Sequence, residues 1–430
     1  MQALQAVKAY LHPWKTTVGL MLFALCIVSM TITSKTTIPY IYSGSAFIAM
    51  LLALSLPVSG LCNCLFFSLP FSSILKLPVG VFGFVTLMQI LLIARIMLEA
   101  SAGVRRRSLY IAVGCVASQI LSVLFFGQTL MNVILLTFNA LLLYGMTILT
   151  RHKYINIKNL FLWFSLGVLT AGIINMLTGI HVFVVQEHRF CGLWTDPNFW
   201  GIFCIIGIAA SLIACLKRPL TWVYNLPIAI GLAYQGFLTL SRSFLIAFAF
   251  VVVLMSISFL RHEISIKRGI LLASILCLSA SFALPFVTTT LNKRVFDVND
   301  ISNGRIESAL AYLEFFFQTP LPVLFGFGYN NTMNATEAFG VSDIVSHCSY
   351  IDLFLEFGVV NILLLTAILV HISHKFHMNL SNLQTIQGLV VCLLLVYMAM
   401  FSMLKYSFVF LFFGIFLGSA VLYRGKTLSR

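Results

Sequence analysis

The sequence contains few charged residues. Aspartate, glutamate, lysine and arginine make up only 9% of its 430 residues, whereas soluble proteins carry roughly 25%. Hydrophobic residues make up 60% of the chain, which is more apolar material than the core of a water-soluble protein can absorb. These proportions exclude an ordinary soluble protein.

Long hydrophobic runs recur from about Thr17 to Leu422, and many reach the roughly 20 residues that a helix needs to cross a bilayer. Because backbone groups in lipid must be satisfied within each segment, these runs predict helices. The short alternating strands of an outer-membrane barrel are missing. The predicted fold is an all-α polytopic integral membrane protein with about 12–14 transmembrane helices, in which residues 1–430 form a single membrane domain.

Fourteen segments are the predicted spans, and the apolar stretch from Leu61 to Ile74 is the weakest of them. If that stretch is only re-entrant or interfacial, thirteen spans remain and the N-terminus moves to the outside. The fourteen segments are residues 17–34, 38–57, 59–75, 77–98, 108–127, 130–149, 162–183, 195–216, 220–240, 243–260, 269–289, 351–371, 385–403 and 406–423.

Lysine and arginine are distributed unevenly over the connecting loops. Lys8 and Lys15 favour an inner N-terminus, and this topology puts eighteen of the 26 basic residues inside and eight outside, as the positive-inside rule requires. The net charge of +14 is therefore a sign of membrane orientation, and nucleic acid is not an expected partner. Ten of the twelve acids lie outside or at outer span ends, so polar function is expected on the outer face.

Several chemical signatures are also missing. The outer segments contain no metal-ligand cluster, glycine-rich phosphate loop or HExxH motif, and the chain shows no internal repeat. The ten cysteines are scattered, mostly within apolar runs, where they read as small buried hydrophobes. No metal and no cofactor are expected.

One long external loop, at about residues 290–350, interrupts the series of spans. It contains a helix-like stretch from Ile306 to Gln318 and a segment rich in proline and glycine. A structureless loop of that length would be unusual, so we expect it to fold over the membrane surface and to carry part of the active site.

The first polar patch outside the membrane runs from Glu187 to Asn198 and enters a span. Asp196-Pro197-Asn198 is typical of a helix start, because aspartate is a common N-cap and proline suits the first turn. The motif either only orients the span or also places Arg189 at the membrane surface. Asp196 is not our candidate for a catalytic base.

The second patch is Ser241-Arg242-Ser243, at a tight outer turn between two spans. Charges at such positions are costly and default to functional hypotheses. Arg242 is either a surface anchor that extends to the headgroups or a phosphate ligand, for which the planar guanidinium is suited.

The third patch contains Arg305 and, later in the loop, His347. A histidine titrates near neutral pH and can act as a general base; the alternative is that His347 only caps the following span. Asp352 and Glu356 follow at a spacing of four residues, on one face of the entering helix, where either could orient the base or balance a nearby cation.

In order, spacing and external placement, these patches resemble the O-antigen ligase/polymerase superfamily of bacterial envelope enzymes over about residues 185–375. The resemblance rests on four boxes, which are Arg189, Gly192 and Asp196-Pro197-Asn198; Ser241-Arg242; Arg305, Pro320 and Gly326-Phe327-Gly328; and His347, Tyr350 and Glu356-Phe357-Gly358.

The resemblance implies a GT-C-like glycosyltransferase of the bacterial cytoplasmic membrane, with its active site facing the periplasm or outside. The donor would be a glycan on undecaprenyl pyrophosphate, and transfer would be inverting and independent of metal. His347 would be the base, and Arg189, Arg242 and Arg305 would bind pyrophosphate. Asp196, Asn198, Tyr350 and Glu356 would support them. Membrane lipid and a chain-length regulator protein are the further partners considered.

The leading interpretation is a polymerase of lipid-linked repeat units of O-antigen, capsule or exopolysaccharide. Ligases of this superfamily commonly have asparagine after the histidine, whereas this chain has Cys348-Ser349. A ligase that transfers glycan to lipid A–core is the first alternative. A transporter or flippase of lipid-linked oligosaccharide is an alternative of another class, although transporters usually place ionisable groups near the bilayer midplane. A non-catalytic scaffold would leave the external arginines unexplained.

Overall fold

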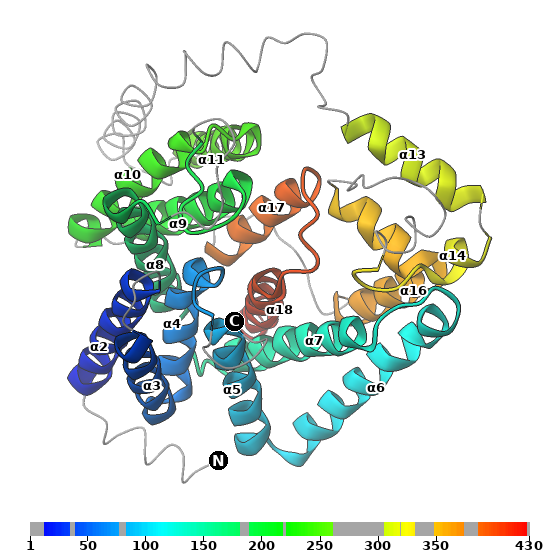
Figure 1. Ribbon diagram of the computed structural model, residues 1–430, viewed down its shortest axis with the longest axis horizontal. Helices are drawn as coiled ribbons and strands as arrows, with labels where there is room; N and C mark the ends of the chain where they lie inside the picture. The colour runs from blue at the N-terminus through cyan, green and yellow to red at the C-terminus, as the bar shows by residue number, and fades with distance from the viewer. Residues whose placement is uncertain are drawn as a thin grey trace. The chain divides into compact units, whose positions relative to one another are not determined.

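The computed structural model is helical along nearly all of the chain that it describes (Figure 1). The described residues are 13–34, 39–76, 83–180, 189–217, 221–260, 305–318, 320–331, 348–373 and 386–427. The helices are α2 (Pro13–Thr33), α3 (Pro39–Ser55), α4 (Val58–Ser68), the 3-10 turn η1 (Leu69–Phe71), α5 (Phe84–Glu99), α6 (Ala102–Phe125), α7 (Leu130–Arg151), α8 (Ile157–Thr178), α9 (Pro197–Lys217), α10 (Trp222–Leu238), α11 (Arg242–Leu260), α13 (Arg305–Gln318), α14 (Pro320–Phe325), α16 (Ser349–Ser373), α17 (Ile386–Met398) and α18 (Ser407–Thr427).

The prediction of an all-α membrane protein is confirmed. Five helices in the described ranges are long and apolar enough to cross a bilayer: α2, α6, α7, α8 and α9. Extended pairing within the same ranges is limited to one isolated bridge between Lys76 and Gly83. The predicted span at 269–289 lies outside the described residues, as does most of the loop between α11 and α13.

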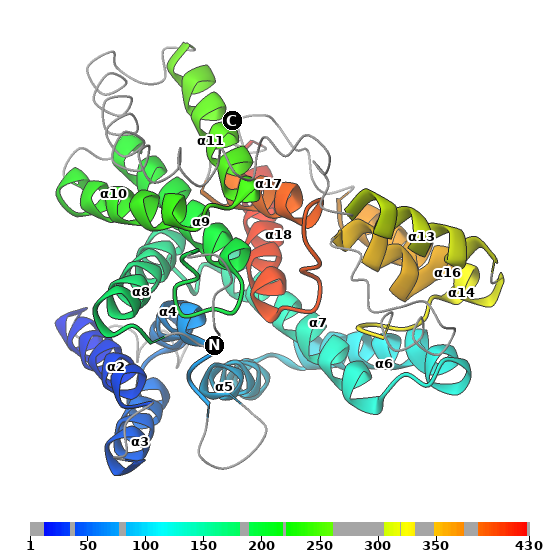
Figure 2. The same cartoon turned by 45° about the horizontal axis from the view of Figure 1, so that its top comes forward.

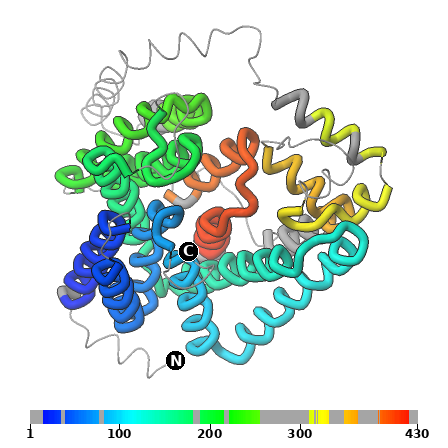
Figure 3. Tube along the Cα trace, in the orientation of Figure 1, coloured from blue at the N-terminus to red at the C-terminus, as the bar shows by residue number. Residues whose placement is uncertain are grey.

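The chain folds into two compact units, each made from two stretches of sequence (Figure 3). The first unit comprises Met1–Arg95 and Lys153–Thr290, and its described helices are α2 to α5 and α8 to α11. The second unit comprises Ile96–His152 and Leu291–Arg430, with α6, α7, α13, α14 and α16 to α18. Each unit has its own buried apolar interior.

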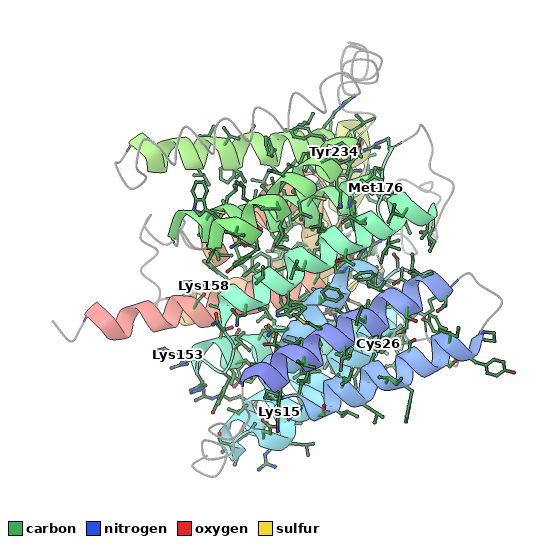
Figure 4. All side chains as sticks on the ribbon, turned by 90° about the vertical axis from the view of Figure 1, so that its left-hand side faces the viewer. Lys15, Cys26, Lys153, Lys158, Met176 and Tyr234 are labelled. Atoms are coloured by element: carbon green, nitrogen blue, oxygen red, sulfur yellow. The ribbon has the colours of Figure 1, made fainter. Side chains whose placement is uncertain are left out.

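Figure 4 shows Lys153 and Lys158 toward its left-hand side, whereas Met176 and Tyr234 lie farther right. The two lysines belong to a segment predicted to lie inside, and Met176 and Tyr234 lie near predicted outer span ends. The orientation of these ends across a membrane stays a prediction.

The weakest predicted span, residues 59–75, is not one regular helix. An eleven-residue helix, α4, passes into the 3-10 turn η1 at Leu69-Pro70, and nearly every side chain from Gly60 to Phe71 is buried. The segment nevertheless runs the length of α3. Arg95 contacts the Leu56 carbonyl where the segment begins, and Tyr42 donates to the Lys76 carbonyl where it ends. Its backbone is irregular where protein covers it, which is where a membrane protein tolerates irregularity.

Close packing explains why α4 can be so short and so buried. A Cβ on Gly167 of α8 would lie 2.2 Å from the Phe67 carbonyl oxygen, so the two helices touch backbone to backbone. Small residues at helix contacts permit this approach in membrane proteins. The rings of Phe66 and Phe164 meet edge to face at 6.4 Å across the same contact.

The predicted span at 385–403 is shorter than expected. Helix α17 ends at Met398, and residues 399–406 form turns before α18 begins at Ser407. The helix ends there because backbone groups of residues 399–406 bond to the start of α16 instead of continuing the helix. The Phe401 carbonyl accepts from the backbone N–H of Ser349 over 3.1 Å.

Candidate functional site

In the first unit, the structure brings the Arg189 and Arg242 segments together. The backbone N–H of Phe190 donates to the Leu238 carbonyl at the end of α10 over 3.1 Å. The Nε of Arg189 donates to the Thr239 carbonyl over 3.0 Å. Since α11 begins at Arg242, both arginines belong to one constellation at a helix start.

A chain of side-chain hydrogen bonds ties the start of α9 to the start of α11. The Oδ1 of Asp196 accepts from the backbone N–H and from the Nδ2 of Asn198, both over 2.7 Å. The Oδ1 of Asn198 accepts from the Ser241 hydroxyl over 2.6 Å, and the Ser241 oxygen accepts from the Phe244 N–H over 3.2 Å. The predicted helix start at Asp196-Pro197-Asn198 is confirmed. The Asp196 carboxylate caps α9, which is a structural role and not that of a catalytic base.

Gly192 turns the chain between Arg189 and the α9 cap. Its φ is +55°, and a Cβ there would lie 2.1 Å from the indole ring of Trp200. Glycine is therefore required both for the left-handed backbone and for the close approach of Trp200, which is fully buried.

The electrostatics of this constellation favour an anion. Arg189 and Arg242 outnumber Asp196, and the starts of α9 and α11 add the partial positive charge of two helix dipoles. Burial raises the pKa of the neighbouring Cys191 thiol to about 11; Asp196 adds to the rise and Arg189 opposes it. Cys191 is therefore a thiol and not a nucleophilic thiolate at neutral pH.

Residues around η1 contact the loop that carries Arg189. No motif in the sequence indicated this contact. The indole Nε1 of Trp194 donates to the Pro70 carbonyl over 3.1 Å, and the Ser73 hydroxyl donates to the Leu193 carbonyl. The irregular segment that follows α4 is thus a platform for the loop that carries Arg189.

In the second unit, the two glycine-containing boxes pair through their backbones. The N–H of Phe327 donates to the Leu355 carbonyl over 2.8 Å, and the N–H of Gly328 donates to the Glu356 carbonyl over 2.9 Å. A Cβ on Gly326 would lie 2.3 Å from the Glu356 carbonyl oxygen. The boxes are about thirty residues apart in sequence and directly adjacent in space.

This pairing breaks the predicted span at 351–371. Helix α16 is interrupted at Gly358, whose φ of 66° and ψ of 176° are not helical. In an unbroken helix the Leu355 and Glu356 carbonyls would accept from residues 359 and 360. The break makes these carbonyls available to Phe327 and Gly328, so the prediction of a single continuous helix was wrong there.

Glu356 is buried at this junction, on the same helical face as Asp352 as predicted. The backbone N–H of Asn330 donates to the Glu356 side chain. Burial raises the pKa of the adjacent Tyr329 hydroxyl. Tyr329 is therefore a hydrogen-bonding group rather than an acid.

Neutral polar side chains hold the Tyr329 segment in place, and these were missed in the sequence. Gln119 accepts from the backbone N–H of Tyr329 over 2.8 Å, and Gln128 donates to the Tyr329 carbonyl over 3.2 Å. Asn139 donates to the Tyr329 hydroxyl over 3.0 Å, and that hydroxyl donates to the Leu404 carbonyl over 2.7 Å. Gln119 and Asn139 lie within predicted apolar spans, where an amide needs a hydrogen-bond partner, so their positions could have indicated this network.

Ser349 and Tyr350 bind the start of α16 to the connection between α17 and α18. The buried Ser349 hydroxyl accepts from the Met403 N–H over 2.7 Å and donates to the Phe401 carbonyl. The Tyr350 hydroxyl donates to the Leu395 carbonyl over 2.9 Å while 43% of the residue stays exposed. The backbone that follows His347 is thus fixed from Ser349 onward.

The remaining predicted site residues are only partly located. Arg305 is the first residue of α13, which confirms the helix-like stretch from Ile306 to Gln318. The Arg305 side chain and all of His347 lie outside what the structure describes. Among the described residues, no group of three or more histidine, cysteine, aspartate or glutamate side chains could hold a metal ion.

Comparison of the chain with protein-family models and with curated proteins found no match. Its chemistry must therefore be argued from the two constellations themselves. One is cationic and built on helix starts; the other is a buried carboxylate in a network of neutral polar groups.

Proposed function

We propose that this protein is a glycosyltransferase that polymerises oligosaccharide repeat units carried on undecaprenyl pyrophosphate. The reaction would take place at the outer face of the cytoplasmic membrane and yield O-antigen, capsule or exopolysaccharide. One observation carries the proposal: Arg189 bonds the Thr239 carbonyl, three residues before Arg242, and Ser241 bonds Asn198 at the start of α9, in an otherwise charge-poor membrane unit.

Pyrophosphate is the group that this cationic constellation fits best. Guanidinium groups grip phosphate oxygens with parallel hydrogen bonds, and helix N-termini add N–H donors and positive potential. A single surface anchor would need only Arg242. The bonds from Arg189 to Thr239 and from Ser241 to Asn198 fix both arginine segments, which favours a ligand over a simple anchor.

In the proposed reaction, a hydroxyl oxygen of the acceptor sugar attacks the anomeric carbon of the donor. The bond from that carbon to the pyrophosphate oxygen breaks, and direct displacement inverts the anomeric configuration. His347 takes the hydroxyl proton, and Arg189, Arg242 and Arg305 stabilise the charge that develops on the leaving group. Tyr350 and Glu356 support the base from the start of α16.

The test is polymerisation by purified protein in lipid, with lipid-linked repeat units as the only substrate. Products that form a ladder with one-repeat spacing on a gel indicate a polymerase. The loss of a charge-assisted contact in Arg242→Ala should slow ladder formation roughly 10- to 100-fold. Loss of a general base in His347→Ala should slow it about 10²- to 10⁴-fold.

Arg106→Ala is the matched control, since Arg106 is an exposed arginine on the predicted inner side whose Nε donates to the Tyr110 hydroxyl. It should leave the ladder unchanged. Full activity of both Arg242→Ala and His347→Ala in normally inserted protein would reject the assigned roles. Transfer that requires lipid A–core would instead identify a ligase, and substrate movement without product would identify a transporter.

A further inference from the structure

Helices α13 and α14 expose a row of large apolar side chains. Leu310 and Phe317 on α13 are 61% and 64% exposed, and Leu321 and Leu324 on α14 are 50% and 45% exposed. Leu310 and Phe317 are seven residues apart on α13, and Leu321 and Leu324 are three apart on α14, so each pair lies on one face of its own helix. We call these four residues the α13–α14 apolar face.

The opposite side of the two helices already has its partner. Tyr312 is buried with Phe327 and Leu355, and Val323 packs against the same cluster. Phe317 belongs to the α13–α14 apolar face, but its ring also reaches Phe354 of α16, with centroids 6.2 Å apart. The α13–α14 apolar face is therefore a second apolar surface on helices that are already packed against α16. In water, that second surface would be expected to be polar.

The α13–α14 apolar face continues a surface that faces lipid. Helix α6 is long and apolar enough to span a bilayer, and few of its residues are buried. Its exposed side recurs at helical spacing and ends at Leu124 and Phe125, which are 69% and 62% exposed.

Two contacts connect that end of α6 to α14. The Ser122 hydroxyl donates to the Gly326 carbonyl over 3.3 Å, and the rings of Phe126 and Phe327 meet edge to face at 5.3 Å. Figures 1 and 2 both show α14 beside this end of α6. The exposed Leu324 thus lies two residues from the point where α14 joins the exposed apolar end of α6.

We infer that the α13–α14 apolar face is a membrane-binding surface that inserts among the acyl chains of the lipid leaflet at the Phe125 end of α6. Continuity with α6 favours lipid over a protein partner. Glu314 is exposed, four residues after Leu310 and three before Phe317, so its carboxylate would lie at headgroup depth at the edge of the face. This inference does not depend on the proposed glycosyl transfer.

Lipid contact would give the external loop an anchor of its own. Amphipathic segments of this kind lie about 5–10 Å into the boundary between headgroups and acyl chains. Such an anchor would hold α13, and with it the backbone of Arg305, at headgroup depth. That is where the phosphate of any lipid-linked molecule lies.

The test introduces an indole into the face and locates it with quenchers. Full-length Phe317→Trp protein is reconstituted in phosphatidylethanolamine–phosphatidylglycerol vesicles whose acyl chains are brominated near the headgroup. The fluorescence of the wild type, with its five tryptophans, is subtracted. Leu321→Trp repeats the measurement on α14, so that a folding defect in one variant does not decide the result.

Thr195→Trp is the reference for interfacial depth, because Thr195 is an exposed polar residue outside the face, at the predicted outer end of a span. We expect brominated lipid to quench the added indole at Phe317 and Leu321 at least as strongly as at Thr195, as an interfacial depth requires. Aqueous acrylamide should quench them no more than it quenches the Thr195 indole. Quenching of the Phe317 and Leu321 indoles by acrylamide but not by lipid would overturn the inference. Protection from both quenchers would overturn it as well, because it would mean that protein covers the face.

Discussion

The two constellations differ in how they are held. In the first unit, side-chain hydrogen bonds connect the segments: Arg189 donates to the Thr239 carbonyl, and Asn198 links Asp196 to Ser241. In the second unit, the backbone of one glycine box pairs with the backbone of the other around the buried Glu356. The first arrangement fixes the segments that carry two arginines, whereas the second fixes the backbone around a buried glutamate. The comparison suggests that charge placement is critical in one unit and backbone shape in the other.

The largest effect should come from adding a methyl group at the glycine junction. In Gly326→Ala or Gly358→Ala, the new Cβ would lie 2.3 or 2.4 Å from backbone atoms at positive φ. Backbone strain and overpacking together should lower the free energy of unfolding by about 2–6 kcal/mol. Thermal unfolding in detergent micelles measures the change.

Two further variants sharpen this contrast. In Gly192→Ala the clash is with the Trp200 side chain, which can shift further than backbone, so the loss should be smaller than at Gly326. Gly114 in α6 has open space around it, and Gly114→Ala should be neutral or stabilising by up to about 1 kcal/mol. Equal losses at Gly192 and Gly326 would contradict the distinction between the two units.

The next prediction compares two tyrosines within the second unit. Tyr329 and Tyr350 each donate to a carbonyl, over 2.7 and 2.9 Å, but Tyr329 is 1% exposed and Tyr350 is 43% exposed. Tyr329→Phe leaves the Leu404 carbonyl and the Asn139 amide without their partner, which costs about 1–3 kcal/mol when groups are buried.

Tyr350→Phe should cost less than about 1 kcal/mol, because water can replace the lost partner at an exposed site. Unfolding of the two variants in the same detergent gives the difference directly. A Tyr350→Phe loss as large as that of Tyr329→Phe would show that burial does not set the strength of these bonds here.

The sequence predicted features that depend on neighbouring residues and missed features that depend on contacts between distant segments. The start of α9 was predicted, because a capping residue and proline act within one helical turn, and the start of α11 was predicted from the tight turn between two apolar runs. The break at Gly358 was not, because it depends on a contact with Gly326 far away in the chain. The irregular end of the 59–75 segment depends likewise on packing against α8.

The candidate site divides in the same way. Sequence pattern selected Arg189 and Arg242, since an arginine at the outer end of an apolar span is conspicuous. It did not select Gln119, Gln128 or Asn139, because neutral amides carry no charge signal and all three bond groups of Tyr329, which is distant in sequence. Uncharged polar residues inside predicted spans thus indicate contacts that charged residues do not reveal.

The smallest expected effect concerns Cys191 and tests the electrostatics of the first constellation. Its pKa in the folded protein is about 11, against an ordinary value of 9.0, because burial and Asp196 disfavour the thiolate more than Arg189 favours it. The folded state therefore holds the proton more tightly than the unfolded state does. The associated stability is fully present below about pH 9 and is lost as the pH rises through about 11.

Cys191→Ser removes this group while keeping a small side chain, so the variant should lose less stability than the wild type between pH 9 and 11. In the wild type, Cys191 should also resist alkylation at pH 8, read residue by residue by mass spectrometry, because the thiolate is the reactive form. Arg189→Gln removes the one opposing cation and should slow alkylation further. Faster alkylation in Arg189→Gln would mean that Arg189 shields the thiol by contact, not by charge, and the cationic character assigned to this constellation would then lose its support at Arg189.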